Sequence, residues 1–324
     1  MSIRRQSTVA VFAMCAFAAF ASADIILIHD GSETNFGSDL GFLDFGNSQD
    51  SSLHLALAAA QTGDTVEIRD NIAWQHVRNN GYRMNTAGVT LRGGDGFSPS
   101  IVSSHTGTNS FFYVNAPDIT IENIILDNSS SKYGNYAIQA SDKIGATNTY
   151  TAQNLTINNM EFRGMRGAMN SGSGELDNFT FTNNIVDDTR YGLGKSGLNY
   201  GAGLSTIEGN TFIHSASGDA GAPDSSPLSS NDRAIWIESL VGDLSILNNI
   251  FTDYDGHYAV FSDVVSPAEI TLSGNSFGSG IGGTGALLDL VPLPGGGHAV
   301  GLIPTPGAMA LLPIAGVFAV RRRR

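Results

Sequence analysis

Apolar and polar residues alternate along six short segments of this chain, and the segments share one eight-residue pattern. Positions three and eight are apolar in every copy, position two is Thr or Ser, and position five is Asn or Gly. Position one is apolar except at Ser205, and position six is Asn in the last four copies. The copies span residues 119–126, 155–162, 179–186, 205–212, 244–251 and 270–277.

This alternation predicts a short strand in each copy, because residues two apart on a strand point to the same face. Positions one and three then face inward, and the Thr or Ser between them faces outward. The Asn or Gly that follows is a turn residue that tolerates left-handed backbone angles. Since position eight returns an apolar residue to the core, each copy predicts a strand, a tight bend and a second strand.

A second signature, a small residue followed by an aliphatic one, recurs after each copy and predicts a further strand. Its members are Ala137-Ile138, Ala168-Met169, Gly192-Leu193, Ala234-Ile235, Ala259-Val260 and Ala286-Leu287. The copies start 36, 24, 26, 39 and 26 residues apart, and a strand-like pattern repeated at such intervals is typical of a solenoid. An antiparallel sandwich also has many short strands, but it does not explain why both signatures recur in register.

The two signatures resemble the repeats of right-handed parallel β-helix proteins of the pectate-lyase-like superfamily, over residues 63–290. The resemblance implies an all-β fold, a right-handed parallel β-helix (solenoid), in which Asn stacks on Asn and Phe on Phe. Residues 24–62 are expected to close its amino-terminal end with a strand and a short N-terminal capping helix. That helix is predicted at 50–60, with Asp50 as N-cap. Residues 89–94 predict an early coil, and residues 25–28 predict a strand without an assigned place.

Residues 1–23 have the pattern of a secretory signal peptide: Arg4 and Arg5, an apolar run from Val9 to Phe20, and small residues before the next segment. A membrane anchor is the alternative, but the run is too short to span a bilayer. Cys15, the single cysteine of the chain, lies in that run. The mature chain is therefore expected to have neither a disulfide nor a thiol nucleophile.

The end of the chain carries a second targeting pattern after a linker at 291–302. Residues 303–324 combine a Pro-containing motif, a short apolar stretch and a terminal arginine cluster. They resemble the PEP-CTERM sorting signals of Gram-negative bacteria, with Pro304-Thr305-Pro306 in place of the family's Pro-Glu-Pro. The resemblance implies transient membrane association, processing by an exosortase, and delivery to the cell surface or extracellular matrix. A permanent membrane anchor is the alternative.

The net negative charge of the chain disfavours negatively charged partners. The formal net charge is −13, and without the six arginines of the two end segments 11 basic and 30 acidic residues remain, a net charge of −19. Such a chain should repel nucleic acid and anionic membranes. Clustered carboxylates can hold Ca²⁺, although a high negative charge also serves solubility alone.

The family resemblance implies where chemistry is expected. Enzymes of this superfamily cleave acidic polysaccharides on one face of the coil stack. The lyases use carboxylate-bound Ca²⁺ and an Arg or Lys base, and the hydrolases use two carboxylates. Asp187, Asp188 and Arg190 form the most lyase-like cluster and are the candidate catalytic residues. The alternative is a polar solenoid corner, since Asp–Arg neighbours often form plain ion pairs. No catalytic motif of the family matches residue by residue.

Candidate substrate-binding residues come from the repeat register. Counting two residues back from each small residue aligns Arg190 with Arg166, Asp232 and His257. Trp236 and Phe261 lie two residues after their small residues, so they should point outward on adjacent coils and can stack on sugar rings. Loops at 141–153 and 214–232 interrupt the winding. These loops either form the walls of a binding site or are surface insertions. The alternative for the aromatic pair is that the second loop or the carboxy-terminal tail covers it.

These patterns favour an exported, polysaccharide-interacting β-helix protein of the cell surface or extracellular matrix, without a recognisable catalytic motif. Its expected partners are an extracellular polysaccharide, a signal peptidase and an exosortase-type enzyme. A polysaccharide lyase or glycoside hydrolase acting on acidic polysaccharide, with the lyase favoured, is the alternative. A passive structural element without a ligand is a third reading.

Overall fold

The computed structural model describes residues 25–28, 50–74, 81–94, 96–103, 110–132, 134–140, 151–171, 174–213, 233–252, 258–263, 269–277, 291–292 and 298–300, and the structural statements below concern these residues. Several sequence predictions fall outside them: the signal peptide at 1–23, the sorting segment at 303–324, the loop at 214–232 with Asp232, His257, and the pair Ala286-Leu287.

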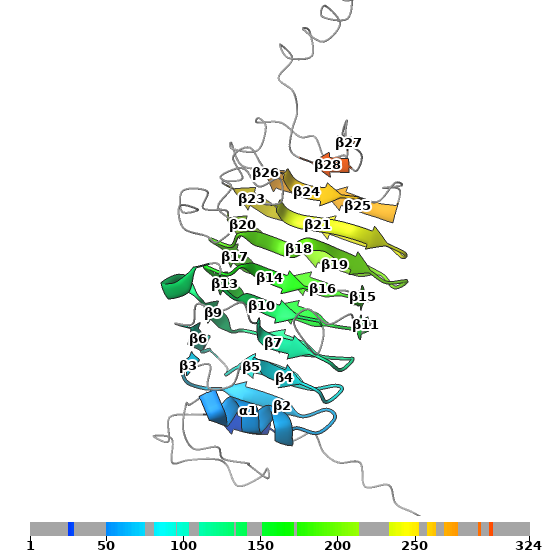
Figure 1. Cartoon of the computed structure of the whole chain (residues 1–324). Helices are drawn as coiled ribbons and strands as arrows, with labels where there is room; N and C mark the ends of the chain where they lie inside the picture. The colour runs from blue at the N-terminus through cyan, green and yellow to red at the C-terminus, as the bar shows by residue number, and fades with distance from the viewer. Residues whose placement is uncertain are drawn as a thin grey trace, which may run out of the picture.

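Three long sheets run along the molecule, and each coil of the chain passes through them in turn (Figure 1). Sheet 1 contains, in spatial order, β1 (Ile25–Ile28), β2 (Thr65–Ile68), β5 (Thr90–Gly93), β8 (Thr120–Glu122), β12 (Thr156–Asn158), β16 (Thr180–Thr182), β19 (Ser205–Glu208), β22 (Leu244–Leu247) and β25 (Ile270–Ser273). Sheet 2 contains β3 (Ile72–Trp74), β6 (Ser100–Ser103), β9 (Ile125–Asp127), β13 (Glu161–Arg163), β17 (Ile185–Asp187), β20 (Thr211–Ile213), β23 (Ile250–Thr252) and β26 (Ser276–Phe277).

Sheet 3 is built from the small-residue signature. Its strands are β4 (Tyr82–Met84), β7 (Ser110–Val114), β10 (Tyr136–Gln139), β14 (Gly167–Asn170), β18 (Tyr191–Tyr200), β21 (Arg233–Leu240) and β24 (Tyr258–Ser262), followed by β28 (His298–Val300) and β27 (Val291–Pro292). Two short strands, β11 (Thr151–Gln153) and β15 (Glu175–Asp177), pair beside it, and β15 also pairs with the end of β18. A 3-10 turn, η1 (Ser129–Ser131), follows β9.

Successive coils pair in parallel in all three sheets, and only the ladders of β28 with β24 and β27 are antiparallel. This arrangement confirms the predicted all-β parallel β-helix, and the antiparallel sandwich is wrong. The reason is the register: position two of each copy lies opposite position two of the next, as Thr156 does between Thr120 and Thr180. The strand at 25–28 also finds its place, as the edge strand β1 beside β2.

The predicted bend at position five is confirmed in every copy by a positive φ. The angles are 58° at Asn123, 50° at Asn159, 56° at Asn183, 66° at Gly209, 55° at Asn248 and 67° at Gly274. A left-handed backbone is costly for most side chains, and Gly and Asn adopt it most readily. The recurring Asn or Gly is therefore required by the turn from sheet 1 into sheet 2.

The core is a continuous column of stacked apolar side chains. Phe212 stacks on Phe251 with ring centroids 5.1 Å apart and planes 7° apart, and Phe251 stacks on Phe277 at 5.2 Å and 8°. Phe181 joins this column between Phe162 and Phe212. The expected stacking of Phe on Phe is present, and each such pair contributes about 0.5–1.5 kcal/mol beyond the area that it buries.

One line of hydroxyl side chains runs along the outside of sheet 1. Position two supplies it, and the register aligns Thr65, Thr90, Thr120, Thr156, Thr180, Thr206, Ser245 and Thr271 on successive strands. β-branched residues fit a pleated, half-buried surface, so this line explains why position two is Thr in five copies of the repeat.

Each end of the solenoid is covered by a different element. Helix α1 (Asp50–Ala59) packs Leu53, Ala56 and Leu57 against β1, β3 and β4, which confirms the predicted capping helix. At the other end β28 adds to the edge strand β24. Open strand edges invite association with other chains, and these additions limit that exposure.

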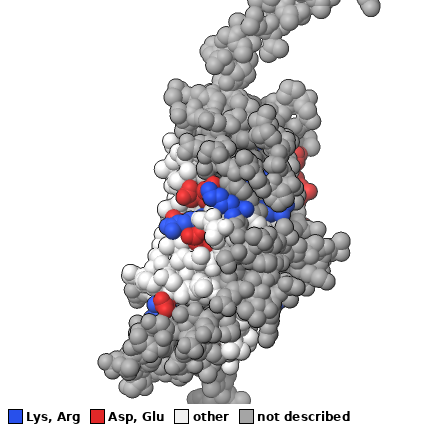
Figure 2. All heavy atoms as spheres, turned by 60° about the vertical axis from the view of Figure 1, so that its left-hand side comes forward, with Lys and Arg blue, Asp and Glu red and all other residues white. Residues whose placement is uncertain are grey.

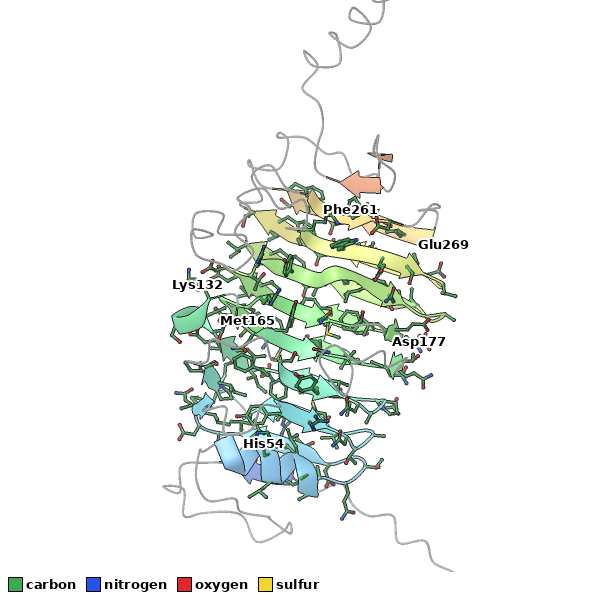
Figure 3. The ribbon with its side chains drawn as sticks, viewed as in Figure 1. His54, Lys132, Met165, Asp177, Phe261 and Glu269 are labelled. Carbon is green, nitrogen blue, oxygen red and sulfur yellow. The ribbon has the colours of Figure 1, made fainter. Side chains whose placement is uncertain are left out.

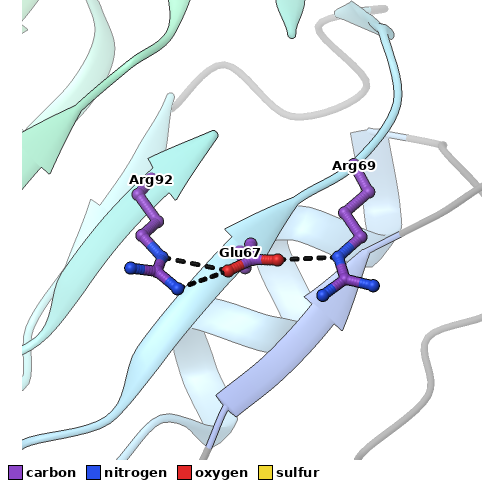
Figure 4. Close-up of polar contacts among 3 residues, drawn as sticks. All are labelled: Glu67, Arg69 and Arg92. Carbon is purple, nitrogen blue, oxygen red and sulfur yellow. Dashed lines mark hydrogen bonds and ion pairs between the residues drawn. The ribbon is translucent and has the colours of Figure 1, made fainter. Parts of the chain in front are cut away.

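A buried carboxylate joins the first two full coils. Glu67 on β2 is 2 % exposed, and its two oxygens accept hydrogen bonds from Arg69 at 2.6 Å and from Arg92 on β5 at 2.7 and 3.0 Å (Figure 4). A buried charge is tolerated only when it is paired, so the two guanidinium groups account for the position of Glu67. Within the described part of the chain, no helix is long and apolar enough to cross a membrane.

Candidate functional site

The outer face of sheet 3 brings arginine and aromatic side chains together over consecutive coils. Arg166 and Arg190 lie in the same register, since the pairing of β14 with β18 places Gly167 opposite Tyr191. The Arg166 amide donates to the Asn135 carbonyl oxygen at 2.7 Å on the preceding coil. The column expected from the sequence thus holds for its described members. Its other members, Asp232 and His257, lie outside the described residues.

Each arginine of this face stands over an aromatic ring. The guanidinium carbon lies 5.7 Å from the ring centroid for Arg83 and Tyr113, 5.4 Å for Arg166 and Tyr136, and 5.1 Å for Arg190 and Tyr191. These tyrosines were not among the candidate residues predicted from the sequence. The available signal was that Tyr136 and Tyr191 directly precede the small residue of their coils.

Arg233 makes the closest of these contacts, and it was also missed. Its guanidinium carbon lies 3.5 Å from the ring centroid of Phe261 and 4.2 Å from that of Trp236. A cation over an aromatic face contributes about 0.5–2 kcal/mol, with the larger values at desolvated sites. Arg233 is 7 % exposed and Arg190 is 4 % exposed, so both lie beneath the surface of this face.

Trp236 is the aromatic residue of the predicted pair that keeps exposed surface. The register places it opposite Phe261 on the adjacent strand, with ring centroids 5.9 Å apart and planes at 82°. Phe261, labelled on β24 in Figure 3, is 7 % exposed and lies against Arg233. Trp236 is half-buried, and it is therefore the residue on which a flat ligand can stack.

Three neighbours fix the indole ring of Trp236. Arg233 lies against its face, Phe261 meets it edge to face, and its Nε1–H donates to Asp263 Oδ2 at 2.7 Å. Asp263, which follows β24, was not among the sequence candidates, because nothing in the local pattern joins it to a residue 27 positions earlier. The result is an aromatic ring held in one orientation at the surface.

Polar side chains surround this ring on the same face. Ile237 lies opposite Ser262, so the next residues, Glu238 and Asp263, lie side by side at the edge of the sheet. Both are exposed. Further along β21, the exposed Ser239 donates its hydroxyl to Asn199 Oδ1 at 2.7 Å. Hydrogen-bond acceptors therefore lie beside the aromatic surface.

The predicted catalytic residues lie at a corner between sheets 2 and 3. Asp187 ends β17, Asp188 makes the turn with a φ of 49°, and Arg190 leads into β18. Asp188 forms an ion pair with Lys132, and Arg190 stands over Tyr191. These contacts are compatible with a polar corner and with the predicted site, so both interpretations of the three residues stay open.

A line of alternating charge runs along the outer face of sheet 2 beside this corner. Arg163 lies between Asp127 and Asp187 in the strand register, and its Nε donates to Glu161 at 2.6 Å. In Figure 2 acidic and basic side chains gather in a band partway along the molecule, and the described residues next to this band are mostly uncharged. Lys132, at the left edge in Figure 3, belongs to the same band.

Two residues of this band, Asp187 and Arg163, have shifted pKa values. Partial burial raises the pKa of the Asp187 carboxyl group, the charges of Asp188 and Glu161 raise that pKa further, and Arg163 opposes them. The hydrogen bond from Arg163 to Glu161 raises the pKa of the guanidinium group. In the part of the chain that the structure describes, no three His, Cys, Asp or Glu side chains converge as metal ligands.

Comparison with known proteins adds no assignment to these residues. No protein-family model, curated protein or solved structure matches this chain. The parallel β-helix and the geometry of its outer faces are therefore the ground for a functional proposal.

Proposed function

We propose that this protein is an exported β-helix protein of the cell surface or extracellular matrix that binds an extracellular polysaccharide on the outer face of sheet 3. A solenoid offers an extended, regular face to a polymer. On this face Trp236 provides a flat apolar surface, and its neighbours provide hydrogen-bond acceptors. Ligand sites commonly combine an aromatic surface with a few placed polar groups.

The observation that carries the proposal is the immobilised indole of Trp236. The contact of the indole face with Arg233 and the hydrogen bond from the indole N–H to Asp263 hold the ring in one orientation before a ligand binds. A side chain ordered in advance loses little conformational entropy on binding. A fixed, half-exposed tryptophan is therefore better suited to stacking on a sugar ring than a free surface side chain.

Binding to a panel of polysaccharides by affinity electrophoresis and pull-down tests the proposal. Trp236→Ala is expected to abolish retention by the polymer that the unmodified protein binds, and Trp236→Phe is expected to keep part of it. Ile250→Ala is the matched control, since Ile250 is an exposed apolar residue at 45 % on sheet 2. Retention that Trp236→Ala does not change, or the absence of binding to any polymer, contradicts the proposal.

The exported location rests on residues 1–23 and 303–324, with a signal peptidase and an exosortase-type enzyme as processing partners. Mass spectrometry of the mature protein from a Gram-negative host that carries an exosortase tests it. The expected chain starts at Asp24 and lacks the terminal arginine cluster. A chain that keeps both end segments and stays in the cytoplasm contradicts the location.

A polysaccharide lyase or glycoside hydrolase at Asp187, Asp188 and Arg190 is the second candidate. The raised pKa of Asp187 favours it, since a carboxyl group that holds its proton to a higher pH can act as a general acid. Ultraviolet absorbance of unsaturated uronates detects a lyase, and release of reducing ends detects a hydrolase. Activity that survives in an Asp188→Ala, Arg190→Ala double variant contradicts this site.

A further inference from the structure

We infer that the polymer bound at Trp236 is a neutral polysaccharide and not a uronate polymer. The inference rests on the proposed function and assigns its ligand class. It depends on which charges the described face presents next to the indole ring and which charges it keeps underneath.

The side chains exposed beside Trp236 are acidic. Asp263 uses Oδ2 to accept the indole N–H, and Glu238 lies next to Asp263 in the register of β21 and β24. Both carboxylates are exposed. A carboxylate accepts strong hydrogen bonds from neutral hydroxyl groups, so the two side chains suit a sugar that offers hydroxyl donors at its edge.

Two arginines of the same face, Arg233 and Arg190, are buried, whereas Arg83 and Arg166, on other coils, are partly exposed. Arg233 is 7 % exposed and packs against the rings of Trp236 and Phe261, and Arg190 is 4 % exposed against Tyr191. Each of these guanidinium groups lies against an aromatic ring of the face. A uronate stacked on Trp236 therefore meets Glu238 and Asp263 as like charges, and like charges in a partly desolvated contact repel each other.

The overall charge acts in the same direction. The chain without its two end segments carries a net charge of −19, and a protein field of that sign lowers the local concentration of a polyanion. A neutral polymer carries no net charge, so that field does not repel it. The geometry and the field thus select against the same class of ligand.

The experiment compares the full-length mature protein on neutral and acidic polymers of similar length. The probes are a neutral β-glucan, a neutral mannan, polygalacturonate and alginate, each in low and high salt. We expect Trp236-dependent retention by a neutral polymer that changes less than about twofold with salt, because screening acts on charge pairs. We expect no Trp236-dependent retention by either uronate polymer.

Two conservative variants test the acceptors. Glu238→Gln is expected to weaken binding of the neutral polymer about tenfold, since it removes a charged acceptor but keeps the shape of the side chain. Asp263→Asn, which keeps an oxygen for the indole N–H, is expected to do the same. Circular dichroism and thermal unfolding confirm that each variant folds.

The outcomes separate this inference from the proposal on which it rests. Retention by polygalacturonate or alginate that Trp236→Ala abolishes, with no retention by neutral polymers, overturns the inference and leaves the binding function standing. Neutral binding that neither acceptor variant weakens overturns the inference as well. If no polymer shows Trp236-dependent retention, the proposed function itself fails.

Discussion

The Asn210 side chain donates its Nδ2–H to Asn249 Oδ1 on the next coil at 2.9 Å. The same relation joins Asn184 to Asn210 at 3.0 Å and Asn249 to Asn275 at 3.0 Å. Each Nδ2 also donates to a backbone carbonyl oxygen, and each Oδ1 also accepts a backbone N–H, as Asn210 Oδ1 does from Asn184 at 2.8 Å. In the last four copies, position six therefore forms a buried amide ladder whose side chains bond along the axis of the solenoid.

Removing one member of this ladder should destabilise the coils on both sides. We expect Asn210→Ala to lower the free energy of unfolding by about 3 kcal/mol, because it removes the bonds of the Asn210 side chain to the Asn184 backbone N–H, the Phe181 carbonyl oxygen and the side chains of Asn184 and Asn249, all in the interior. Urea denaturation followed by circular dichroism measures this change. Ser245→Ala, a half-exposed position on sheet 1, is the control and should cost less than about 0.5 kcal/mol. Equal effects of the two variants contradict the role of the ladder.

The bend at position five predicts a strict order among substitutions at Asn248. Its φ of 55° is accessible to Gly at little cost and to β-branched residues at a high cost. We expect Asn248→Gly to change stability by less than about 1 kcal/mol and Asn248→Val to cost about 2 kcal/mol or more. The midpoint of chemical unfolding checks the order. A Val variant as stable as the Gly variant shows that the backbone angle is not what selects Asn here.

The contact between Arg233 and Trp236 should be visible in fluorescence. The chain has two tryptophans, so a Trp74→Phe background leaves Trp236 as the reporter. We expect Arg233→Met to increase quenching of Trp236 by acrylamide, because the cation no longer lies on the indole face.

The same variant should weaken polysaccharide binding about tenfold through loss of the fixed ring orientation. Arg83→Met, which removes a similar contact with Tyr113 on an early coil, is the matched control and should change neither reading. Unchanged quenching in Arg233→Met means that Asp263 and Phe261 alone hold the ring.

Asp187 should make stability depend on pH in a defined direction. Its pKa is raised in the folded state, so the folded protein binds the proton more tightly than the unfolded chain. Stability from this group therefore falls as the pH rises from below the usual value of 3.8 through the raised folded pKa. We expect Asp187→Asn to be more stable than the unmodified protein above that window. A comparison of unfolding midpoints across acidic and neutral pH measures it, and a gain that does not vary with pH rules out the titration of Asp187 as its source.

Much of the winding could be predicted because its determinants are local. The alternation at positions one to three and the bend residue at position five fix strand, turn and strand within eight residues, and the structure repeats them at Asn123, Asn183 and Asn248 alike. The stacking of like residues followed directly from that register. The candidate site was harder to predict from the sequence. Arg233 and Asp263 contact Trp236 from positions that the repeat does not constrain, and Asp263 lies on a different coil.

The predicted cluster at Asp187, Asp188 and Arg190 shows the same limit. The three residues are close in sequence, but Lys132, an ion-pair partner of Asp188, comes from 56 positions earlier in the chain, and Arg190 turns to the ring of Tyr191. Closeness in sequence predicted the cluster, whereas the contacts of its members with Lys132 and Tyr191 became visible only in the structure.

The sequence by itself determined the parallel β-helix, the capping helix and the residues at each bend, since backbone angles and alternating burial act through neighbours along the chain. Only the tertiary structure decided which outward side chains are covered and which remain available. Trp236 and Phe261 have the same repeat position and lie opposite each other, yet Phe261 is buried against Arg233 and Trp236 keeps exposed surface. That difference arises from packing between coils, where burial depends on side chains that are distant in the sequence.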